Sequence, residues 1–286
     1  MHQPRFLTPQ QTVKVIAPAG KVNDRESLEQ GIKLWQDQGY KVDLANYDRA
    51  WHYLAAPDRE RFAELAHSWC RYGALVCGRG GYGTLRLLPH LDHLGEGCPW
   101  VIGFSDITAL LWGLAQQRQI MSIHAPVLVT LPQTAAPAQA ALFALVAGKL
   151  DHLCLKGIPW QGGKASGILL PGNLTVATHL LGTPYIPPWE DVILALEDVD
   201  EPPYKIDRMV TQWHLSGFFQ RVRGIALGNF GDDPALEIIL KERLLGLGIP
   251  IVSGLAFGHC SDNYPLVLGA KCLLNGDDGE LTWYLN

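Results

Sequence analysis

Short apolar runs alternate with stretches of helical periodicity along the first half of the chain. The apolar runs predict β-strands at residues 13–17, 41–45, 74–77 and 100–104. The segment Asn23-Asp24 can cap a helix after the first strand, and Asp58 can cap another after the second. Strands that alternate with helices in this way predict an α/β domain with a mostly parallel sheet flanked by helices.

The second half of the chain is predicted to form a smaller domain. Residues 157–165 are rich in Gly, Pro and polar side chains, which is typical of a linker, so domains are expected at 1–156 and 166–286. The later pattern predicts strands near 167–170, 192–196, 224–227 and 249–253, helices at 206–215 and 236–245, and a hairpin within 272–284. We therefore expect a mixed α/β domain with a barrel-like sheet.

The composition argues against several classes of protein. Of the 286 residues, 48% are hydrophobic and 18% charged, and the net charge of -5 provides no basic surface for nucleic acid. No targeting segment or membrane-spanning apolar run is evident, so we expect no membrane partner and a cytoplasmic location. The six cysteines have no Cys-x-x-Cys pair and no zinc spacing, and are expected to be reduced and mostly buried.

Ser105 stands where a predicted strand turns directly into a predicted helix. Such a turn lifts the hydroxyl out of the sheet and aims the amide of the next residue, Asp106, at the place where an oxyanion would form. The usual hydrolase turn has glycine two residues after the serine, whereas this chain has Ile107. The segment therefore fits a nucleophile, and it equally fits a plain helix N-cap.

A glycine-rich loop follows the preceding predicted strand, with four glycines in the six residues from Gly78 to Gly83. Glycines let the backbone approach a ligand closely and turn N–H groups toward an anion. The loop lacks the lysine and hydroxyl of a phosphate-binding nucleotide loop, so an oxyanion or a carboxylate fits at least as well as a phosphate. A plain tight turn is the alternative.

A serine nucleophile requires a base and an acceptor that orients the base, and the second half of the chain offers both. His259 follows a predicted strand and a glycine, which places it in a loop at a strand end. Glu197 ends another apolar strand, where the alternative role is that of a solvated strand terminus. His90 and His93 have ligand-like spacing but no evident third partner, so no metal site is expected.

Taken together, these segments resemble the LD-carboxypeptidase family, which includes the microcin C resistance peptidases. Phe104 and Pro171 depart from the residues frequent in the family, which are tyrosine and glycine. The segments that carry the resemblance span nearly the whole chain: Ile16-Ala-Pro-Ala-Gly, Tyr53-Leu-Ala-Ala-Pro-Asp-Arg-Glu-Arg, Gly78-Arg-Gly-Gly-Tyr-Gly-Thr, Gly103-Phe-Ser-Asp-Ile-Thr, His124-Ala-Pro-Val, Gly172-Asn-Leu, Leu196-Glu-Asp-Val-Asp-Glu-Pro-Pro-Tyr and Gly258-His.

The resemblance implies a serine peptidase that uses no cofactor or metal. Matched motif by motif, it makes Ser105 the nucleophile, Glu197 the carboxylate and His259 the base. It also implies that oxyanion amides come from Asp106 and from Gly81 in the glycine loop. A carboxypeptidase must in addition bind a free terminal carboxylate, for which Arg79 and the loop backbone at Gly80 are the candidates, although Arg79 equally fits a pair with an acidic neighbour.

The implied substrate is a small peptide, a muropeptide from which a C-terminal D-alanine is removed at an L-centre during cell-wall recycling. Two alternatives stay open. One is a microcin C-type peptidase that cleaves an aminoacyl-nucleotide or another peptide conjugate, and the other is a non-catalytic sensor that binds muropeptide. The assembly is open between a monomer and a homodimer.

Overall fold

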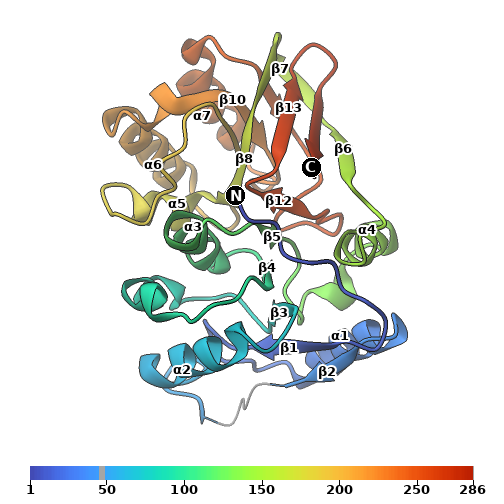
Figure 1. Ribbon diagram of the computed structural model, residues 1–286. Coiled ribbons are helices and arrows are strands. Elements are labelled where there is room, and N and C mark those ends of the chain that lie inside the picture. Colours follow the sequence, from blue (N-terminus) through green and yellow to red (C-terminus); the bar gives the residue numbers. More distant parts are fainter. Residues whose placement is uncertain (45–48, 286) are drawn as a thin grey trace.

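The computed structural model describes residues 1–44 and 49–285, and its strands form two sheets (Figure 1). All pairs in the first sheet are parallel except the pair made by its last edge strand, so the mostly parallel N-terminal sheet is confirmed. The end of the predicted strand 41–45, at Ala45, lies outside the described residues. From edge to edge the strands are β2 (Lys41–Asp43), β1 (Thr12–Ile16), β3 (Ala74–Cys77), β4 (Trp100–Gly103), β5 (Ser122–His124) and the antiparallel β12 (Leu266–Leu268).

Helices cover this sheet as the sequence pattern predicts. The Asp24 side chain caps the first helix by accepting a hydrogen bond from the Ser27 amide at 2.9 Å. Asp58 begins the second helix as its first residue and is not its cap, which is Pro57. The helices and the long 3-10 segment are α1 (Arg25–Asp37), α2 (Asp58–Trp69), η2 (Thr84–His93), α3 (Ile107–Arg118) and α4 (Ala136–Val146).

The second sheet is mixed, as expected for the C-terminal part. Its four central strands are parallel and its outer strands antiparallel. In order they are β6 (His152–Lys156), β14 (Glu280–Tyr284), β13 (Lys271–Asn275), β8 (Lys164–Asn173), β9 (Val192–Glu197), β10 (Val222–Leu227), β11 (Ile251–Ser253) and β7 (Ile158–Gln161), with α5 (Leu174–Leu180), α6 (Pro203–Leu215) and α7 (Pro234–Leu244) between them in the chain.

This sheet is open rather than a closed barrel. No ladder pairs its edge strands β6 and β7 within the described residues. A single residue, Gly157, nevertheless separates the two strands in sequence, and its N–H donates to the Gly279 carbonyl at 2.8 Å. The sheet therefore curls until its edges lie near each other at this point, which gives a barrel-like form without closure.

The segment expected as a linker, 157–165, instead contributes strands β7 and β8 to the second sheet. Its Gly and Pro content suggested an irregular connection, but Pro159 lies on an edge strand, where proline is tolerated, and Gly162-Gly163 forms the turn between the two strands. The strand β6 also joins the second sheet, and β12 returns to the first. The C-terminal part consequently has the larger of the two sheets, with eight strands against six.

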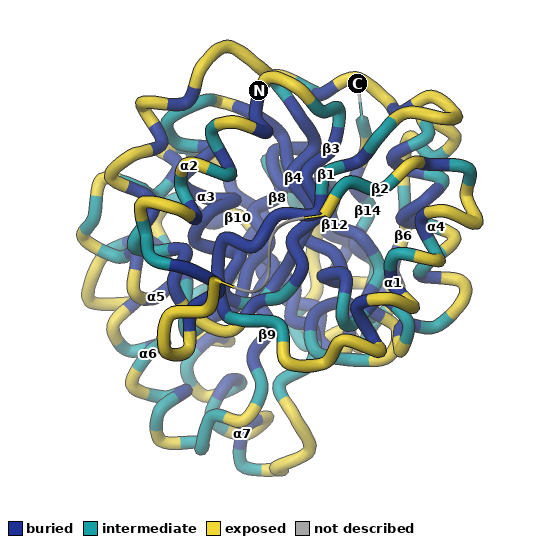
Figure 2. Tube along the Cα trace, turned by 90° about the horizontal axis from the view of Figure 1, so that it is seen from below, coloured by how far each residue is buried: buried dark blue, intermediate teal, exposed yellow. Residues whose placement is uncertain are grey.

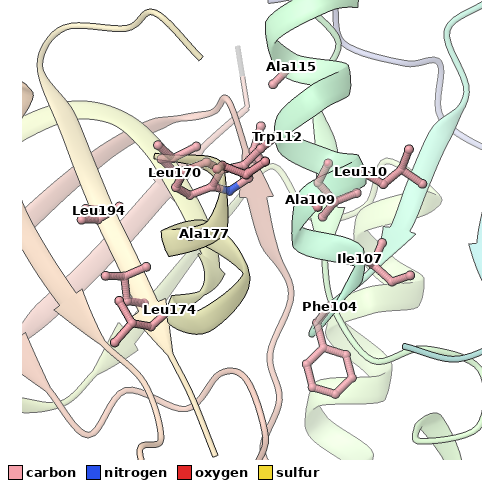
Figure 3. Packing of buried hydrophobic residues seen from close by; sticks show 14 of the residues in the cluster. Phe104, Ile107, Ala109, Leu110, Trp112, Ala115, Leu170, Leu174, Ala177 and Leu194 are labelled. Carbon is pink, nitrogen blue, oxygen red and sulfur yellow. The ribbon is translucent and has the colours of Figure 1, made fainter. Parts of the chain in front are cut away.

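Helix α3 joins the two sheets through a shared core (Figure 3). Its residues 107–115 are all buried, which is typical of a helix covered on every side. Trp112 extends from α3 toward Leu170 of β8, and its indole N–H donates to the Pro171 carbonyl at 2.8 Å. Figure 2 shows the buried strands gathered in the middle of the molecule and the exposed segments at its rim. The helix that follows Ser105 is thus held directly against the strand beside Glu197.

The cysteines differ from the expectation in one respect. All six are free thiols, but only Cys77 and Cys272 are buried, whereas Cys70 and Cys154 are exposed. The exposed pair lies at the end of a surface helix and on an edge strand, positions that the count and spacing of cysteines do not reveal. Within the described residues, no helix combines the length and apolar character that crossing a membrane requires.

Candidate active site

The glycine loop and Ser105 follow the carboxyl ends of two neighbouring parallel strands. In the first sheet β3 and β4 are adjacent, so the glycine loop after β3 and Ser105 after β4 lie side by side. The chain reverses its direction of growth between β1 and β3, since β2 pairs on one side of β1 and β3 on the other. Such a reversal leaves a crevice beyond the carboxyl ends of the strands, which is where ligands bind in open α/β sheets.

Ser105 adopts a strained backbone conformation with φ of 62°. A residue other than glycine rarely occupies this left-handed region, and such outliers are concentrated at functional sites. The helix N-cap position belongs to Asp106, and no side-chain cap bond is formed there. The alternative of Ser105 as an ordinary capping residue is therefore wrong, and the sharp strand-to-helix turn fits a nucleophile.

The glycine loop packs directly on Ser105. A β-carbon built on Gly80 would lie 3.3 Å from Ser105 Oγ and 3.2 Å from its Cβ, so a side chain there would crowd the hydroxyl. The Gly80 carbonyl accepts the Gly20 N–H at 3.0 Å, which ties the loop to the segment after β1. Within the described chain the Asp106 N–H has no protein acceptor, so it is available to donate to a ligand.

Glu197 is completely buried and binds His259 through a single carboxylate oxygen. Its Oε2 accepts from the His259 backbone N–H at 3.1 Å and lies 2.6 Å from Nδ1 of the ring. A carboxylate only accepts, so Nδ1 carries the proton and Nε2 is left free as a base. A β-carbon on Gly258 would lie 2.3 Å from Glu197 Cγ, so this pair requires glycine before the histidine. The alternative of a solvated Glu197 is wrong.

The surroundings of His259 raise its pKa above the ordinary value of 6.5. Burial by itself lowers the pKa, but the hydrogen bond and negative charge of Glu197, together with the charges of Asp198 and Asp200, outweigh it. The ring packs against Phe104, the residue before Ser105, with centroids 4.7 Å apart. The structure does not join Ser105 Oγ to His259 by a direct hydrogen bond; such catalytic contacts often tighten only when substrate binds.

A short relay of hydrogen bonds connects the helix of Ser105 to Glu197. Thr108 of α3 accepts the Asn173 backbone N–H at 2.9 Å. The Asn173 amide then donates to Glu197 Oε1 at 3.3 Å and to Asp198 Oδ1 at 3.1 Å. Asn173 also pairs with Glu197 in the register of β8 and β9. The carboxylate is therefore positioned relative to the helix that carries the serine.

Arg79 makes no hydrogen bond or ion pair to Ser105, Glu197 or His259. Its guanidinium donates to the Lys21 carbonyl at 2.6 Å, and the residue lines a cavity of about 310 Å³ with Asn23, Thr130 and Gln133. The structure gives it no acidic partner among the described residues, so the expected pairing with an acidic neighbour is not formed. Its role in binding a substrate carboxylate stays a prediction.

Two family models match the chain. The model of the LD-carboxypeptidase N-terminal domain covers residues 13–125, and that of the C-terminal domain covers residues 166–274. The chain belongs to the LD-carboxypeptidase family. A Synechocystis sp. relative, provisionally named a carboxypeptidase, is 43% identical over 98% of this chain and 97% of its own length. The murein tetrapeptide carboxypeptidase of Pseudomonas aeruginosa is 31% identical over 95% of this chain and 94% of its own.

Solved structures of LD-carboxypeptidases and related proteins share the fold. The muramoyltetrapeptide carboxypeptidase of Oxalobacter formigenes has a TM-score of 0.85 and 27% sequence identity to this chain. The match covers 96% of this chain and 100% of the Oxalobacter formigenes chain. An MccF-like protein of Bacillus anthracis has a TM-score of 0.89 over 100% of both chains, but at 18% identity it shows the fold alone. The resemblance predicted from the motifs is thus confirmed.

Arg61 was given no role in the predicted site, although it lies in a segment that carries the LD-carboxypeptidase resemblance. The side chain is buried and donates to the carbonyls of Pro18, Ala56 and Gly83, the last two at 3.0 Å. Its charge is balanced by Asp58. One buried cation therefore ties the glycine loop to the loops beside it, and an arginine in a charged helix gives no sign of this in the sequence.

His124 is a second residue whose role the sequence left open. It ends β5, is completely buried, and packs edge-on against Phe104 and Phe257, with centroids 6.0 and 6.2 Å away. Burial lowers its pKa to about 4, although the charge of Glu197 opposes that effect, so the ring is neutral near pH 7. His90 and His93 lie in η2 with ring centroids 6.4 Å apart, and the described residues contain no group of three or more metal-ligating side chains.

The relay predicts that Thr108→Val lowers kcat about 10-fold to 100-fold. The substitution leaves the buried Asn173 N–H without its acceptor, which costs about 1–3 kcal/mol, and it frees the carboxylate to shift relative to the serine. Thr178→Val is the matched control, because Thr178 is also buried and its hydroxyl accepts from the Trp213 indole N–H at 2.8 Å and donates to the Leu174 carbonyl, without a hydrogen bond to any member of the relay. Both variants should have a lower melting temperature, and only Thr108→Val should have a lower kcat. Equal kcat values in the two variants would show that the relay does not position the carboxylate.

Proposed function

We propose that this protein is a serine LD-carboxypeptidase that removes the terminal D-alanine from a muropeptide tetrapeptide. The observation that supports this most directly is the bonded Glu197–His259 pair beside the strained Ser105, in a chain that belongs to the LD-carboxypeptidase family. The names of the Pseudomonas aeruginosa relative and the Oxalobacter formigenes structure supply the substrate class.

In the proposed mechanism Ser105 Oγ attacks the carbonyl carbon of the bond before D-alanine while His259 Nε2 takes the hydroxyl proton. The tetrahedral oxyanion is stabilised by the N–H groups of Asp106 and Gly81. His259 then gives its proton to the nitrogen of the departing D-alanine, and the acyl-enzyme forms as that C–N bond breaks. Water, activated by the same ring, hydrolyses the ester and restores Ser105. Glu197 stabilises the imidazolium throughout.

The raised pKa of His259 predicts the pH dependence. Only the neutral ring can accept the serine proton, so kcat/KM should rise with pH through an apparent pKa above the ordinary imidazole value of 6.5. The same shift means that the protonated ring stabilises the fold; this contribution is complete below the unfolded-state pKa and is lost as pH rises through the folded-state pKa. A pH–rate profile measured with the tetrapeptide L-Ala-γ-D-Glu-meso-diaminopimelate-D-Ala tests the prediction. An apparent pKa below 6.5 for the rise in kcat/KM would contradict it.

Mass spectrometry provides the direct test of the function. The protein is incubated with L-Ala-γ-D-Glu-meso-diaminopimelate-D-Ala, and the products are identified. We expect free alanine and the tripeptide, with no cleavage of the same peptide carrying L-alanine at its C-terminus. Intact tetrapeptide after long incubation with a folded sample would contradict the proposal, and would favour the non-catalytic muropeptide sensor if the peptide still binds.

The microcin C-type activity is the second candidate. Its support is the close fold similarity to MccF-type structures, one of which contains glutamyl sulfamoyl guanosine. At 18–20% identity these neighbours show the fold alone. Cleavage of an aminoacyl-nucleotide in preference to the tetrapeptide would establish this alternative. Light scattering distinguishes a monomer from a homodimer.

A further inference from the structure

A cavity of about 640 Å³ lies at the carboxyl ends of β10 and β11, and we call it the β10–β11 cavity. Its volume is in the range of pockets that bind small molecules. Part of its lining is deeply apolar, because Leu227, Leu236 and Leu255 contribute to it and are each 5% exposed or less. None of its lining residues has a role in the proposed reaction. The cavity is therefore a candidate for a separate ligand site.

The charged groups around the cavity are acidic. Its lining within the described chain includes Asp232, Asp233, Glu237 and Asp262 and neither Lys nor Arg. Asp233 is used as the cap of α7, and Glu237 is paired with Lys241 at 2.6 Å. The carboxylates of Asp232 and Asp262 are exposed and have no ion pair or hydrogen bond among the described residues. This uncompensated negative charge attracts a cation and repels an anion.

Ser253 adds a buried polar group without a partner. Ile251 of β11 belongs to the hydrophobic cluster that contains Leu236 and Leu240 of α7, so Ser253, two residues later, faces the same side. Ser253 lines the cavity and is only 6% exposed, and its hydroxyl makes no hydrogen bond within the described residues. A buried hydroxyl in this state is destabilising, and buried polar groups are normally satisfied. A ligand in the cavity would supply the missing partner.

The aromatic part of the lining already accommodates an ammonium group. Trp160 and Phe230 both line the cavity, and Lys241 Nζ lies 5.0 Å from the centroid of the Trp160 ring. This geometry is a cation–π contact, in which the ring face attracts the positive charge. An amine on an aliphatic stem has the same chemistry as this lysine. Its stem suits the leucines, and its charge suits the free carboxylates.

The cavity adjoins the loop that carries the proposed base. Cys260, the residue after His259, lines it. Asn229 lines it as well, and its side-chain amide donates to the His259 carbonyl at 2.6 Å. Burial raises the pKa of the Cys260 thiol, and the charge of Asp262 acts in the same direction, so that carboxylate is close to this loop. A ligand in the cavity would therefore contact residues that support His259.

We propose that the β10–β11 cavity is a binding site for a primary ammonium group on an aliphatic stem. Asp232 and Asp262 attract the ammonium, the Ser253 hydroxyl accepts one of its hydrogen bonds, and the buried leucines pack on the stem. Two sources share this chemistry: a basic side chain of a peptide bound at Ser105, and a free small amine. The site goes beyond the proposed function, because binding at the cavity requires no turnover.

Calorimetry with hexylammonium tests the site, with hexanol and hexanoate as probes that keep the stem and change the charge. The wild type should bind hexylammonium at least about 10-fold more tightly than hexanol, and hexanoate more weakly than either. The preference for hexylammonium over hexanol should shrink as salt is added, because salt screens the exposed carboxylates.

Ser253→Ala should weaken the binding of hexylammonium about 10-fold without lowering the melting temperature, because the hydroxyl has no partner in the free protein. The double variant Asp232→Asn/Asp262→Asn should weaken binding about 5-fold and reduce its salt dependence. The control is Asp92→Asn, which removes an exposed carboxylate of η2 and should leave the affinity unchanged.

Competition identifies the source of the amine. Hexylammonium is titrated into Ser105→Ala protein with and without saturating L-Ala-γ-D-Glu-meso-diaminopimelate-D-Ala. A lower affinity in the presence of the peptide assigns the cavity to a side chain of the peptide, and an unchanged affinity assigns it to a separate small amine. The binding experiments on wild type need no substrate, so a failure of the proposed function leaves them valid. Equal affinities for hexylammonium and hexanol, or an affinity for hexylammonium that neither Ser253→Ala nor the double variant lowers, would overturn the site.

Discussion

Ser105→Ala should abolish turnover, with a loss of at least about 1,000-fold in kcat, while the protein remains folded. Loss of a serine nucleophile in a peptidase removes the covalent step and leaves only what binding and the oxyanion donors supply. The hydroxyl makes no hydrogen bond that holds the described structure together, so its removal should not affect folding. Turnover and circular dichroism measured on one sample test the prediction. If the variant retains more than a few per cent of the activity, Ser105 is not the nucleophile.

Ser105→Gly is an informative partner variant. Alanine keeps the cost of the left-handed backbone at this position, whereas glycine adopts a φ of 62° freely. That cost is about 1–2 kcal/mol for an L-residue, so the glycine variant should unfold at a higher temperature than the alanine variant while being equally inactive. A glycine variant no more stable than the alanine variant would mean that the turn is not strained in solution.

The sequence predicted the elements that local pattern controls. Runs such as 74–77 and 192–196 are apolar because their strands are buried on both faces, and both strands are present in the structure. The pattern failed where the chain is polar and rich in Gly and Pro. The edge strand β7 has exposed Ile158 and Pro159 and looks like a linker, because an edge strand needs neither burial nor a complete set of N–H donors.

The candidate site likewise has residues that the local pattern predicts and residues that it does not. Ser105, Glu197 and His259 could be nominated because nucleophile, carboxylate and base chemistry restricts residue types, and because strand ends mark their positions. The contacts among these three residues depend on the order of the strands in the sheets. Hydrophobic periodicity does not reveal that order. The supporting residues were harder to find: Thr108, Asn173 and Arg61 bond to groups that are distant in sequence, so a role for them becomes visible only in the contacts.

Glu197→Gln should lower kcat by about 10,000-fold, the loss seen when the equivalent carboxylate of an unrelated serine peptidase fold becomes an amide. Glu197 Oε2 accepts both the backbone N–H and the Nδ1–H of His259. A glutamine that presents its NH₂ group there would favour the tautomer with the proton on Nε2, which cannot accept the serine proton. A glutamine turned the other way would face its NH₂ group toward the donating amide of Asn173.

The control for this variant is Asp198→Asn, and the pH profile decides between a catalytic and a structural role. Asp198 is also buried and accepts from Asn173 and Thr175, but it does not touch His259. Asp198→Asn should lose stability and less than about 10-fold in kcat, because only its long-range charge acts on the ring. In Glu197→Gln the hydrogen bond and charge that raise the pKa of His259 are gone, so the acidic limb of the residual activity should move to lower pH. A limb that stays in place while activity falls equally in both variants would show that Glu197 supports the fold and does not orient the base.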